Sequence, residues 1–455
     1  MARTTDEWLP ILAKRLDDRR PRVDTLRSYV NGDAPLPEMG RNVRASWVKW
    51  QKKARANLGE LCVESRANRM VPSGSQVGDA DQDDDRVRAI WRRNRLGVTI
   101  PDTIRDALTA SVSYVVVGRD VFGRAVITGE SPEFMYAATD PLQPWVSRAA
   151  LKVWRDLDEG LDFAYVWVPG LKQKYARSME NEKSNKPWAR AQDGDWVRVG
   201  EPEVFTGPIP VFVLENHGGT GEFEGDTDLI DRINLGILQR LVMVAMQAFR
   251  QRATKGGLPT TDEDGNPIDY AAIFEPAPGA LWDLPEGIEI WESQDASQGI
   301  RAALEAVKDD LREFSGTLSV PLGPMLQDAA NQSAEGAAYN KEGLIFTVRD
   351  RIARWTPPLE AALEAALRVE HPDVTDTVTL LWTNPEHVSL SEKYAASTQA
   401  KASDVPWRTR MTKILGFTAD EVDRMEVERA AEQLQLAALF PQPSALPAGD
   451  VNGGE

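Results

Sequence analysis

The sequence predicts an α+β fold in which strands and helices occupy separate stretches of the chain. Apolar residues recur at steps of three and four within 226–259, 299–317 and 334–368, which is the periodicity of amphipathic helices. Between 104 and 216 short runs rich in Val, Tyr and Phe alternate with turn residues, and this pattern predicts strands. A β-rich part followed by a helical part is typical of an α+β protein.

The helix predicted at 226–259 is apolar on almost every side. Aspartates lie at its start, and basic residues lie at its end before Gly256 and Gly257, as the helix dipole favours. The next helix, 299–317, has a heptad apolar seam opposite a charged face. Both helices therefore need partners. The residues we expect to pack there are Ile230, Ile237, Leu241, Leu304, Val307 and Leu311.

A polar loop is expected between the second helix and the third. Pro321, Gly323 and Pro324 break the helical pattern, and Ser333 is a suitable N-cap for the helix at 334–368. Within that long helix Pro357 and Pro358 predict a kink.

Composition indicates a soluble globular protein that works in a reducing compartment. The chain has 455 residues, 42% of them apolar, one cysteine (Cys62) and no basic, apolar signal segment. The longest apolar run, 229–249, contains charged residues that a bilayer would exclude, so no membrane association is expected. A net charge of −17 argues against tight DNA binding over the whole surface.

The N-terminal third contains two charged segments with competing interpretations. Helices are expected at 4–31 and 41–70, and in the latter basic residues alternate with Trp47 and Trp50. A solvated helix with inward tryptophans is favoured over a nucleic-acid site. The acidic run 78–85 could hold Mg²⁺ in a nuclease, but a solvated loop is favoured because the run is contiguous.

Seven strands are expected between 113 and 216, and the polar stretch 171–194 is expected to be an irregular hairpin. A further strand ends at Asn384-Pro385, and three helices follow at 389–401, 406–415 and 418–439. Thr418 and Glu421 predict a capping box. The Pro- and Gly-rich residues 441–455 are expected to be disordered.

Enzyme chemistry finds no support in the sequence. There is no phosphate-binding G-x-x-x-x-G-K-[ST] motif and no nucleophile elbow. His217, His371 and His387 lack the spacing of metal ligands, and Cys62 between Leu61 and Val63 is best explained as a small buried side chain. We therefore expect no enzymatic activity, no cofactor and no metal.

Several motifs, taken in order, resemble one family. They are Y-x-x-G-D-x-P-L-P at 29–37, A-S-V-S-Y-V-V-V-G at 110–118, E-S-P at 130–132, T-D-P at 139–141, W-R-D at 154–156, G-P-I-P-V-x-x-L-x-N at 207–216 and L-G-F-T-A-D-E at 415–421. Together with the helix order, this succession resembles the portal proteins of tailed bacteriophages, of the siphovirus type found in phages of actinobacteria.

The resemblance implies a portal fold divided into named parts. These are a wing (1–225), a first stem helix (226–259), a clip (260–298), a second stem helix (299–317), a tunnel loop (318–333), a long kinked helix (334–368), a wing strand (369–388), crown helices (389–440) and a disordered tail (441–455). It also implies a ring, dodecameric in the family, at one capsid vertex, through which genomic DNA is packaged and ejected.

Partners and residue roles follow from the same resemblance. The ring would meet capsid and scaffold proteins, the terminase motor, head-completion or adaptor proteins, and double-stranded DNA held weakly and without sequence preference. It would assemble in the host cytoplasm and remain in the virion. Asp262, Glu263, Asp264 and Asp269 of the clip would dock the terminase, and Gln327, Asp328, Asn331 and Gln332 of the tunnel loop would face DNA. The alternatives are a non-portal adaptor or scaffold protein and a metal-dependent nuclease.

Overall fold

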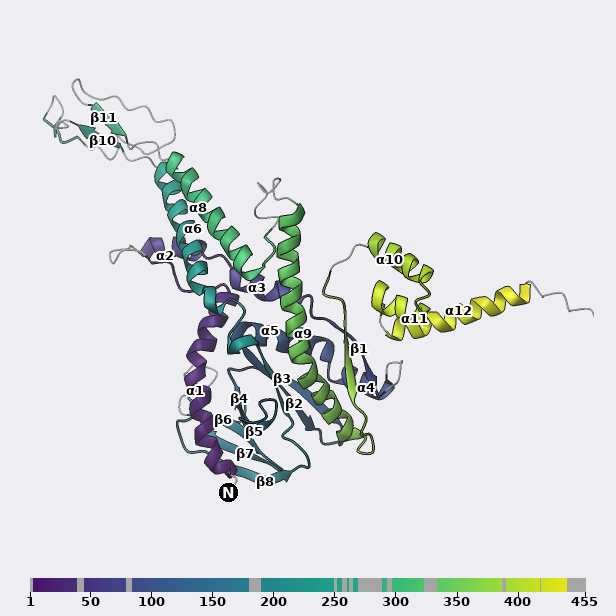
Figure 1. Cartoon of the computed structure of the whole chain (residues 1–455). Helices are drawn as coiled ribbons and strands as arrows, with labels where there is room; N and C mark the ends of the chain where they lie inside the picture. Colours follow the sequence, from purple (N-terminus) through teal and green to yellow (C-terminus); the bar gives the residue numbers. More distant parts are fainter. Residues whose placement is uncertain are drawn as a thin grey trace, which may run out of the picture.

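The computed structural model describes residues 3–38, 45–78, 84–179, 190–248, 252–255, 260–261, 265–268, 289–292, 297–322, 334–386, 390–417 and 419–439. Figure 1 shows an elongated molecule, with a sheet-containing body, a two-helix hairpin that projects from one end of it and a helical C-terminal segment beside it. Among the described helices none has the length and hydropathy needed to cross a membrane.

One side of the body is helix α1 (Thr5–Val30) lying on a five-stranded antiparallel sheet. A capping box between Thr4 and Glu7 starts the helix. Leu12 and Leu16 pack against alternate residues of the sheet, as a pleated surface requires. The strand order is β4-β5-β6-β7-β8, and the strands are β4 (Met135–Thr139), β5 (Ser147–Asp156), β6 (Leu161–Val168), β7 (Leu171–Ser178) and β8 (Val197–Val204).

A second, three-stranded sheet lies behind the first. Its order is β3-β2-β9, formed by β2 (Val112–Arg119), β3 (Ala125–Glu130) and β9 (Val211–Glu215). Tyr114 and Val116 on one face pack against the five-stranded sheet. Val115 and Val117 on the other face join a larger core with α5 (Leu96–Ala110) and α9 (Ala334–Glu370). The two sheets therefore pack face to face, with helices on both outer sides.

Smaller elements close the body. They are α2 (Ala45–Lys53), α3 (Leu58–Ala67), β1 (Pro72–Val77), α4 (Asp85–Arg93), the short η1 (His217–Gly219) and η2 (Glu224–Asp226), and β12 (Val378–Trp382). The strand expected near 378 returns to the body, where β12 pairs with β1. Asp84 caps α4 through the N–H groups of Arg86 and Val87, which is a structural use for one member of the acidic run.

The hairpin consists of α6 (Thr227–Ala248) and α8 (Ser297–Leu318), which lie side by side (Figure 1). At its far end β10 (Arg252–Lys255) pairs with β11 (Glu289–Glu292). Arg252 lies opposite Glu292 and Lys255 opposite Glu289.

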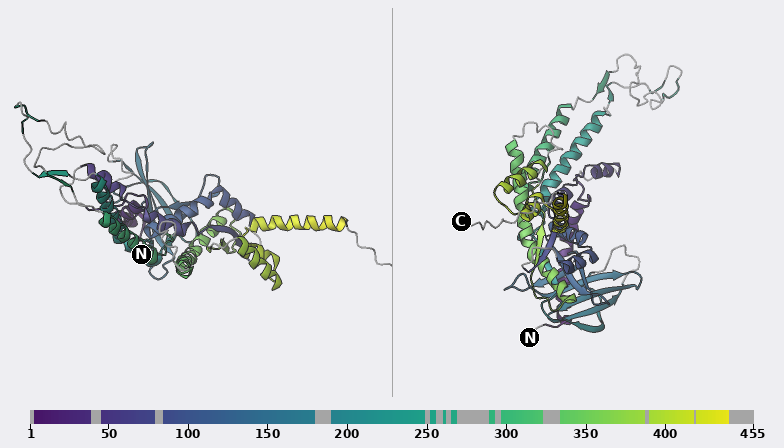
Figure 2. Two further views of the ribbon diagram at one scale, coloured as in Figure 1. Left: turned by 90° about the horizontal axis from the view of Figure 1, so that it is seen from above. Right: turned by 90° about the vertical axis from the view of Figure 1, so that its right-hand side faces the viewer.

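The C-terminal segment contains α10 (Leu390–Ala402), α11 (Trp407–Thr409), a π-helical turn η4 (Arg410–Leu415) and α12 (Ala419–Leu439). Arg408 pairs with Asp423 and Glu426 at 2.6 and 3.1 Å, which holds α11 against α12. Figure 2 shows α12 projecting away from the body, and Val427 and Leu434 on it are exposed.

Four predictions about the elements were wrong in part. The helix expected to reach Lys255 does not do so, because α6 spans Thr227–Ala248 and Arg252–Lys255 is a strand paired with β11. The helix expected at 41–70 is split into α2 and α3, and residue 104 lies in α5, not at the start of the strands. Residues 171–178, expected to be irregular, form β7, which lies between β6 and β8 in the sheet.

β7 was missed because its polar residues have partners that no local pattern reveals. Lys172 and Lys174 lie over aromatic rings of β6 and β5. On the other face the Gln173 amide donates to backbone carbonyls, and Arg177 pairs with Asp162. A polar strand can therefore occupy the middle of a sheet when each polar group is satisfied.

The long helix α9 runs through Pro357 and Pro358, and Figure 1 shows its axis changing direction along its length. Several predicted features lie outside the described residues. They are the clip residues Asp262, Glu263, Asp264 and Asp269, the loop residues Gln327, Asp328, Asn331 and Gln332, the proposed caps Ser333 and Thr418, His387 and the tail 441–455.

Candidate functional site

The hairpin passes from buried to exposed along its length. Near the body, Ile230 and Ile233 of α6 and Phe314 of α8 belong to the main core. Toward the far end, the Val244 and Met246 side chains are 46% and 48% exposed. A projecting helix pair with an apolar end has surface left over for a further partner.

All six residues predicted to pack lie on the hairpin. Ile230 and Val307 are buried, Ile237 and Leu311 are partly buried against the main core, and Leu241 and Leu304 are half-buried. The two helices approach closely at Gly236, where a Cβ atom would lie 2.9 Å from Cγ2 of Val307. The structure thus brings the predicted residues to one helix pair.

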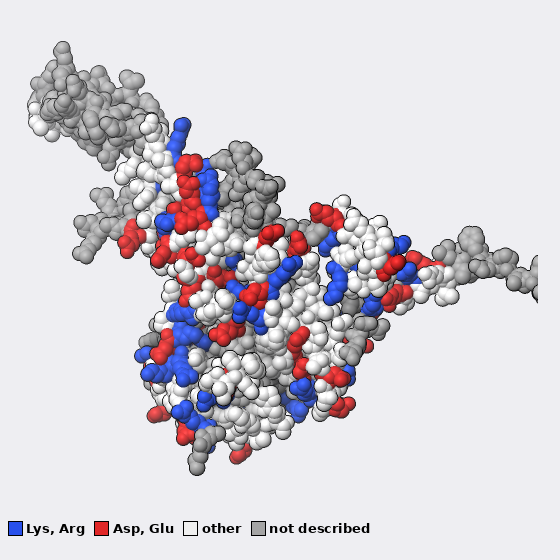
Figure 3. Space-filling model, viewed as in Figure 1, with Lys and Arg blue, Asp and Glu red and all other residues white. Residues whose placement is uncertain are grey.

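The ion pairs that join the two helices of the hairpin lie on its surface. Arg232 of α6 reaches Asp310 at 3.1 Å and also pairs with Glu313, both on α8, and Figure 3 shows acidic and basic side chains close together along this part. Exposed pairs of this kind contribute about 0–1 kcal/mol each. Apolar contact is therefore the main force that holds α6 to α8.

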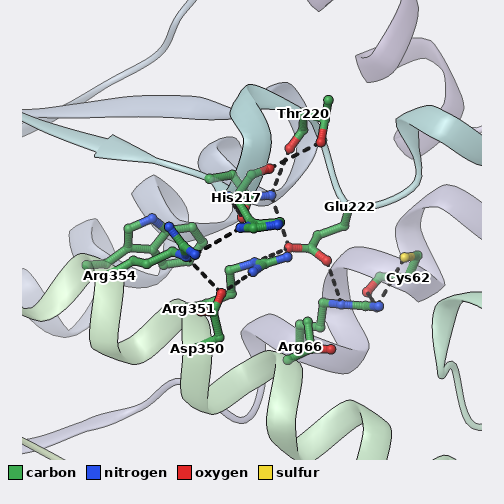
Figure 4. Close-up of polar contacts among 12 residues, drawn as sticks. Cys62, Arg66, His217, Thr220, Glu222, Asp350, Arg351 and Arg354 are labelled. Atoms are coloured by element: carbon green, nitrogen blue, oxygen red, sulfur yellow. Dashed lines mark hydrogen bonds and ion pairs between the residues drawn. The ribbon is translucent and has the colours of Figure 1, made fainter. Parts of the chain in front are cut away.

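Where the hairpin meets the body, a carboxylate is buried between two arginines (Figure 4). The Glu222 and Arg66 side chains are each 3% exposed, and the Arg66 Nε lies 3.0 Å from Glu222 Oε2. Arg351 Nε of α9 lies 2.6 Å from Glu222 Oε1, and the Asn216 amide donates to the same oxygen at 3.0 Å. We call Glu222, Arg66 and Arg351 the junction.

The junction also holds the end of α8. Arg66 Nη2 donates to the carbonyl of Leu318, the last residue of α8, at 2.5 Å, and its Nη1 donates to the Cys62 carbonyl at 2.8 Å. A free carbonyl at a helix C-terminus needs such a partner. The junction therefore fixes the position of the C-terminal end of α8.

Cys62 itself has no reactive character. Its side chain is fully buried, and burial raises the pKa of the Cys62 thiol to about 12 in spite of the nearby Arg66. A thiol that stays protonated is a poor nucleophile. The prediction that Cys62 is a small buried side chain is confirmed.

On the outer side of the junction α9 is tied to the end of β9. The Trp355 indole donates to the Glu215 carbonyl at 2.9 Å, and Arg354 lies 2.9 Å from His217 Nδ1. Arg354 and Arg351 both pair with Asp350. Hydrogen bonds from Arg354, and then from Arg351, hold the pKa of the Asp350 carboxyl below its usual value.

Sequence reasoning did not single out the junction. Glu222 and Arg351 are separated by 129 residues, and neither lies in a motif. His217, interpreted as incidental, is a hydrogen-bonding neighbour of α9. Within the described residues no group of three or more His, Cys, Asp and Glu side chains gathers as metal ligands do.

Comparison with known proteins identifies the family. The model of the family described as phage portal protein, SPP1 Gp6-like, matches residues 11–435. The portal protein of Mycobacterium phage D29 is 24% identical over 417 residues, with 84% of this chain and 81% of the relative covered. That of Mycobacterium phage L5 is 23% identical over 441 residues, with 87% and 86% covered.

Solved structures give more distant similarities. The neck of a native GTA particle, computed with C12 symmetry, has a TM-score of 0.40 at 12% identity and covers 87% of this chain and 99% of its own. An HK97 family phage portal protein from Corynebacterium diphtheriae has a TM-score of 0.32 at 11% identity, with 70% and 90% covered.

The sequence match extends over nearly the whole chain, from within α1 to within α12. The chain therefore belongs to the SPP1 Gp6-like phage portal protein family, and it is a structural protein of the virion, the portal for genomic DNA, and not an enzyme.

Proposed function

We propose that the hairpin is the stem of a ring, dodecameric as in other portals, and that its far end is covered by neighbouring subunits. The observation that carries the proposal is the exposure of Val244 and Met246 at the end of a helix whose base is buried. A closed ring would cover such a surface by repeating one heterologous contact.

The experiment replaces Val244 and Met246 together by Asp. Because both side chains are already about half exposed in the single chain, the subunit should still fold. Rings should be lost in negative-stain images and in sedimentation. The control is Gln239→Asp on the same helix, at a position that is exposed and polar. Intact rings from the double variant would contradict the stem assignment.

The remaining division follows the family. The body would be the wing, β10 and β11 the base of the clip, residues 318–333 the tunnel loop, and α10 to α12 the crown. The ring would assemble in the host cytoplasm with capsid and scaffold proteins and later receive head-completion proteins.

We propose the clip as the docking site of the terminase motor. Residues 260–292 contain nine Asp and Glu residues and no Lys or Arg, so the partner surface should be basic. Replacing Asp262, Glu263 and Asp264 by Ser should weaken terminase binding and reduce its dependence on salt, while rings persist. An affinity equal to that of the wild type at every salt concentration would argue against this docking site.

We propose that residues 324–333 face DNA in transit. This stretch offers Gln327, Asp328, Asn331 and Gln332 and no cation, so it would contact phosphates weakly, because tight binding depends on counterion release by Lys or Arg. Gln327→Lys with Asp328→Lys should leave rings intact and stall packaging, whereas Asp328→Asn should not. Normal packaging by the lysine variant would place the loop away from the channel.

A further inference from the structure

The five-stranded sheet has a row of aromatic side chains on the face opposite α1. Trp154 of β5 stacks on Phe163 of β6, with ring centroids 5.4 Å apart, and its ring also lies 4.7 Å from Tyr165. Alternation along the strands puts these rings on the same face as Ala150 and Trp167. Those two residues are covered by the three-stranded sheet, whereas Trp154 belongs to no core cluster of the described residues.

Two lysines of β7 cover this aromatic row. Lys172 Nζ lies 4.4 Å from the Tyr165 centroid, and Lys174 Nζ lies 3.9 Å from that of Phe163. Lys172 pairs with Glu203 at 2.7 Å, and Glu203 is 57% exposed. Among the described residues no carboxylate is paired with Lys174. A cation held on apolar rings without an anion has lost part of its hydration and would gain from an incoming carboxylate.

Exposed aliphatic side chains continue the same surface. Val197 and Val199 of β8 are 63% and 38% exposed, and they lie opposite Ala176 and Lys174. The free edge of β8 is poorly suited to accept another strand, because Gly200 has a positive φ of 70° and Pro202 follows it. A partner would therefore dock on the face of the sheet and not at its edge.

We propose that this surface, which we call the lysine face (Trp154, Tyr165, Lys172, Lys174, Val197 and Val199), binds an acidic segment of another protein in which carboxylates alternate with aliphatic residues. A carboxylate would pair with Lys174, a second would compete with exposed Glu203 for Lys172, and aliphatic side chains would pack on Trp154 and the two valines. Charge complementarity carries this choice, because a cationic apolar surface stands out on a chain of net charge −17.

The geometry favours a protein partner over a single-stranded nucleic acid. Bases bind to aromatic residues by stacking on a free ring face, and here the lysines already occupy the faces of Phe163 and Tyr165. Glu203, which is exposed beside Lys172, would also repel a phosphate chain.

The test measures binding of the full-length protein to a short fluorescent peptide of repeating Glu-Leu-Glu-Ala by anisotropy. The variants are Lys172→Met and Lys174→Met, singly and together, because Met keeps an apolar stem over the rings and removes only the charge. The matched control is Lys413→Met on η4, which is exposed and remote from the sheet. A peptide with Gln in place of Glu and a labelled oligo-dT test the charge and the class of partner.

The wild type and Lys413→Met should bind the Glu peptide, the double Met variant should bind it about tenfold or more weakly, and the Gln peptide should not bind. The proposal would be overturned if the double variant bound the Glu peptide as tightly as the wild type does. It would also be overturned if the wild type did not bind the peptide, or if it bound oligo-dT in preference to the peptide. Negative-stain images of the same samples report ring formation separately, so a failure of the stem assignment would be distinguishable.

Discussion

Helix α1 is held on the body by arginines in addition to its apolar side chains, whereas α6 is held on α8 mainly by apolar side chains. Arg19 donates to the Tyr114 hydroxyl and to the Pro132 carbonyl, each at 2.7 Å. Arg27 pairs with Asp106 at 2.9 Å and also with Glu133. On the hairpin the cross-helix pairs among the described residues come from Arg232, which is half exposed.

This difference explains how one chain can combine a body of fixed structure with a hairpin whose apolar surface is suited to binding other subunits. Hydrogen bonds from a guanidinium are directional and specify particular partners, so the position of α1 is determined within the subunit. Apolar contact is non-directional, so α6 can pack on α8 and on a neighbouring subunit alike.

The largest effect should come from breaking the junction. Glu222→Gln keeps the shape of the side chain, but it leaves the buried Arg66 without a counter-charge and leaves Arg351 with Asp350 alone. Such a loss typically costs about 3–5 kcal/mol. Chemical unfolding of the subunit would measure it.

The hairpin supplies the control for this prediction. Glu305→Gln removes one partner of an exposed pair with Lys308, in which Glu305 is 59% exposed. It should change the free energy of unfolding by less than about 1 kcal/mol. If both variants lost a similar free energy of unfolding, the buried charges of the junction would stabilise the protein no more than an exposed pair on the hairpin.

Much of the fold could be predicted, because the periodicity of apolar residues in a long segment indicates its secondary structure. The apolar steps of α6, α8 and α9 and the short β-branched strands β2 and β9 are local patterns, and a local pattern is all that a single sequence shows. The family resemblance rests on the same kind of information, in this case short motifs in a fixed order.

The features that could not be predicted depend on residues far apart in sequence. The residues of β10 were predicted to end a helix, because their pairing with Glu289–Glu292 cannot be seen in the local sequence. The lysines of β7 suggest a polar loop in the sequence, because the local pattern does not show that they cover aromatic rings of β5 and β6. At the candidate site the apolar hairpin residues were visible in the sequence, but the junction was not, since its three charged groups have no common motif.

Two glycines, Gly59 in the body and Gly236 in the hairpin, allow the packing of these regions to be compared. A Cβ atom at Gly59 of α3 would lie 2.8 Å from the backbone carbonyl oxygen of Tyr29 in α1, whereas one at Gly236 of α6 would lie 2.9 Å from a side-chain methyl of Val307. Both glycines are inside helices, so Ala offers each the same gain in helix propensity, about 1 kcal/mol.

Gly59→Ala should therefore destabilise the protein by about 1–3 kcal/mol, since two backbones must separate. Gly236→Ala should change stability by less than about 1 kcal/mol in either direction, because a side chain can shift and the propensity gain offsets the cost. Thermal unfolding of both variants would test this. A greater loss at Gly236 would mean that the hairpin is packed as rigidly as the body.

The smallest expected effect concerns pH. Hydrogen bonds from Arg354 and Arg351 lower the pKa of Asp350, so the folded protein holds this proton less tightly than the unfolded chain does. The stabilisation is present above the ordinary pKa of Asp, about 4, and is lost as the pH falls through the lower folded value. Asp350→Asn should therefore lower the melting temperature slightly near neutral pH and flatten its fall in acid. High salt should move the wild type toward the variant, because Asp350 and Arg354 are partly exposed. If the melting temperature fell equally steeply with decreasing pH in both proteins, the pairing of Asp350 with Arg354 would not be coupled to folding.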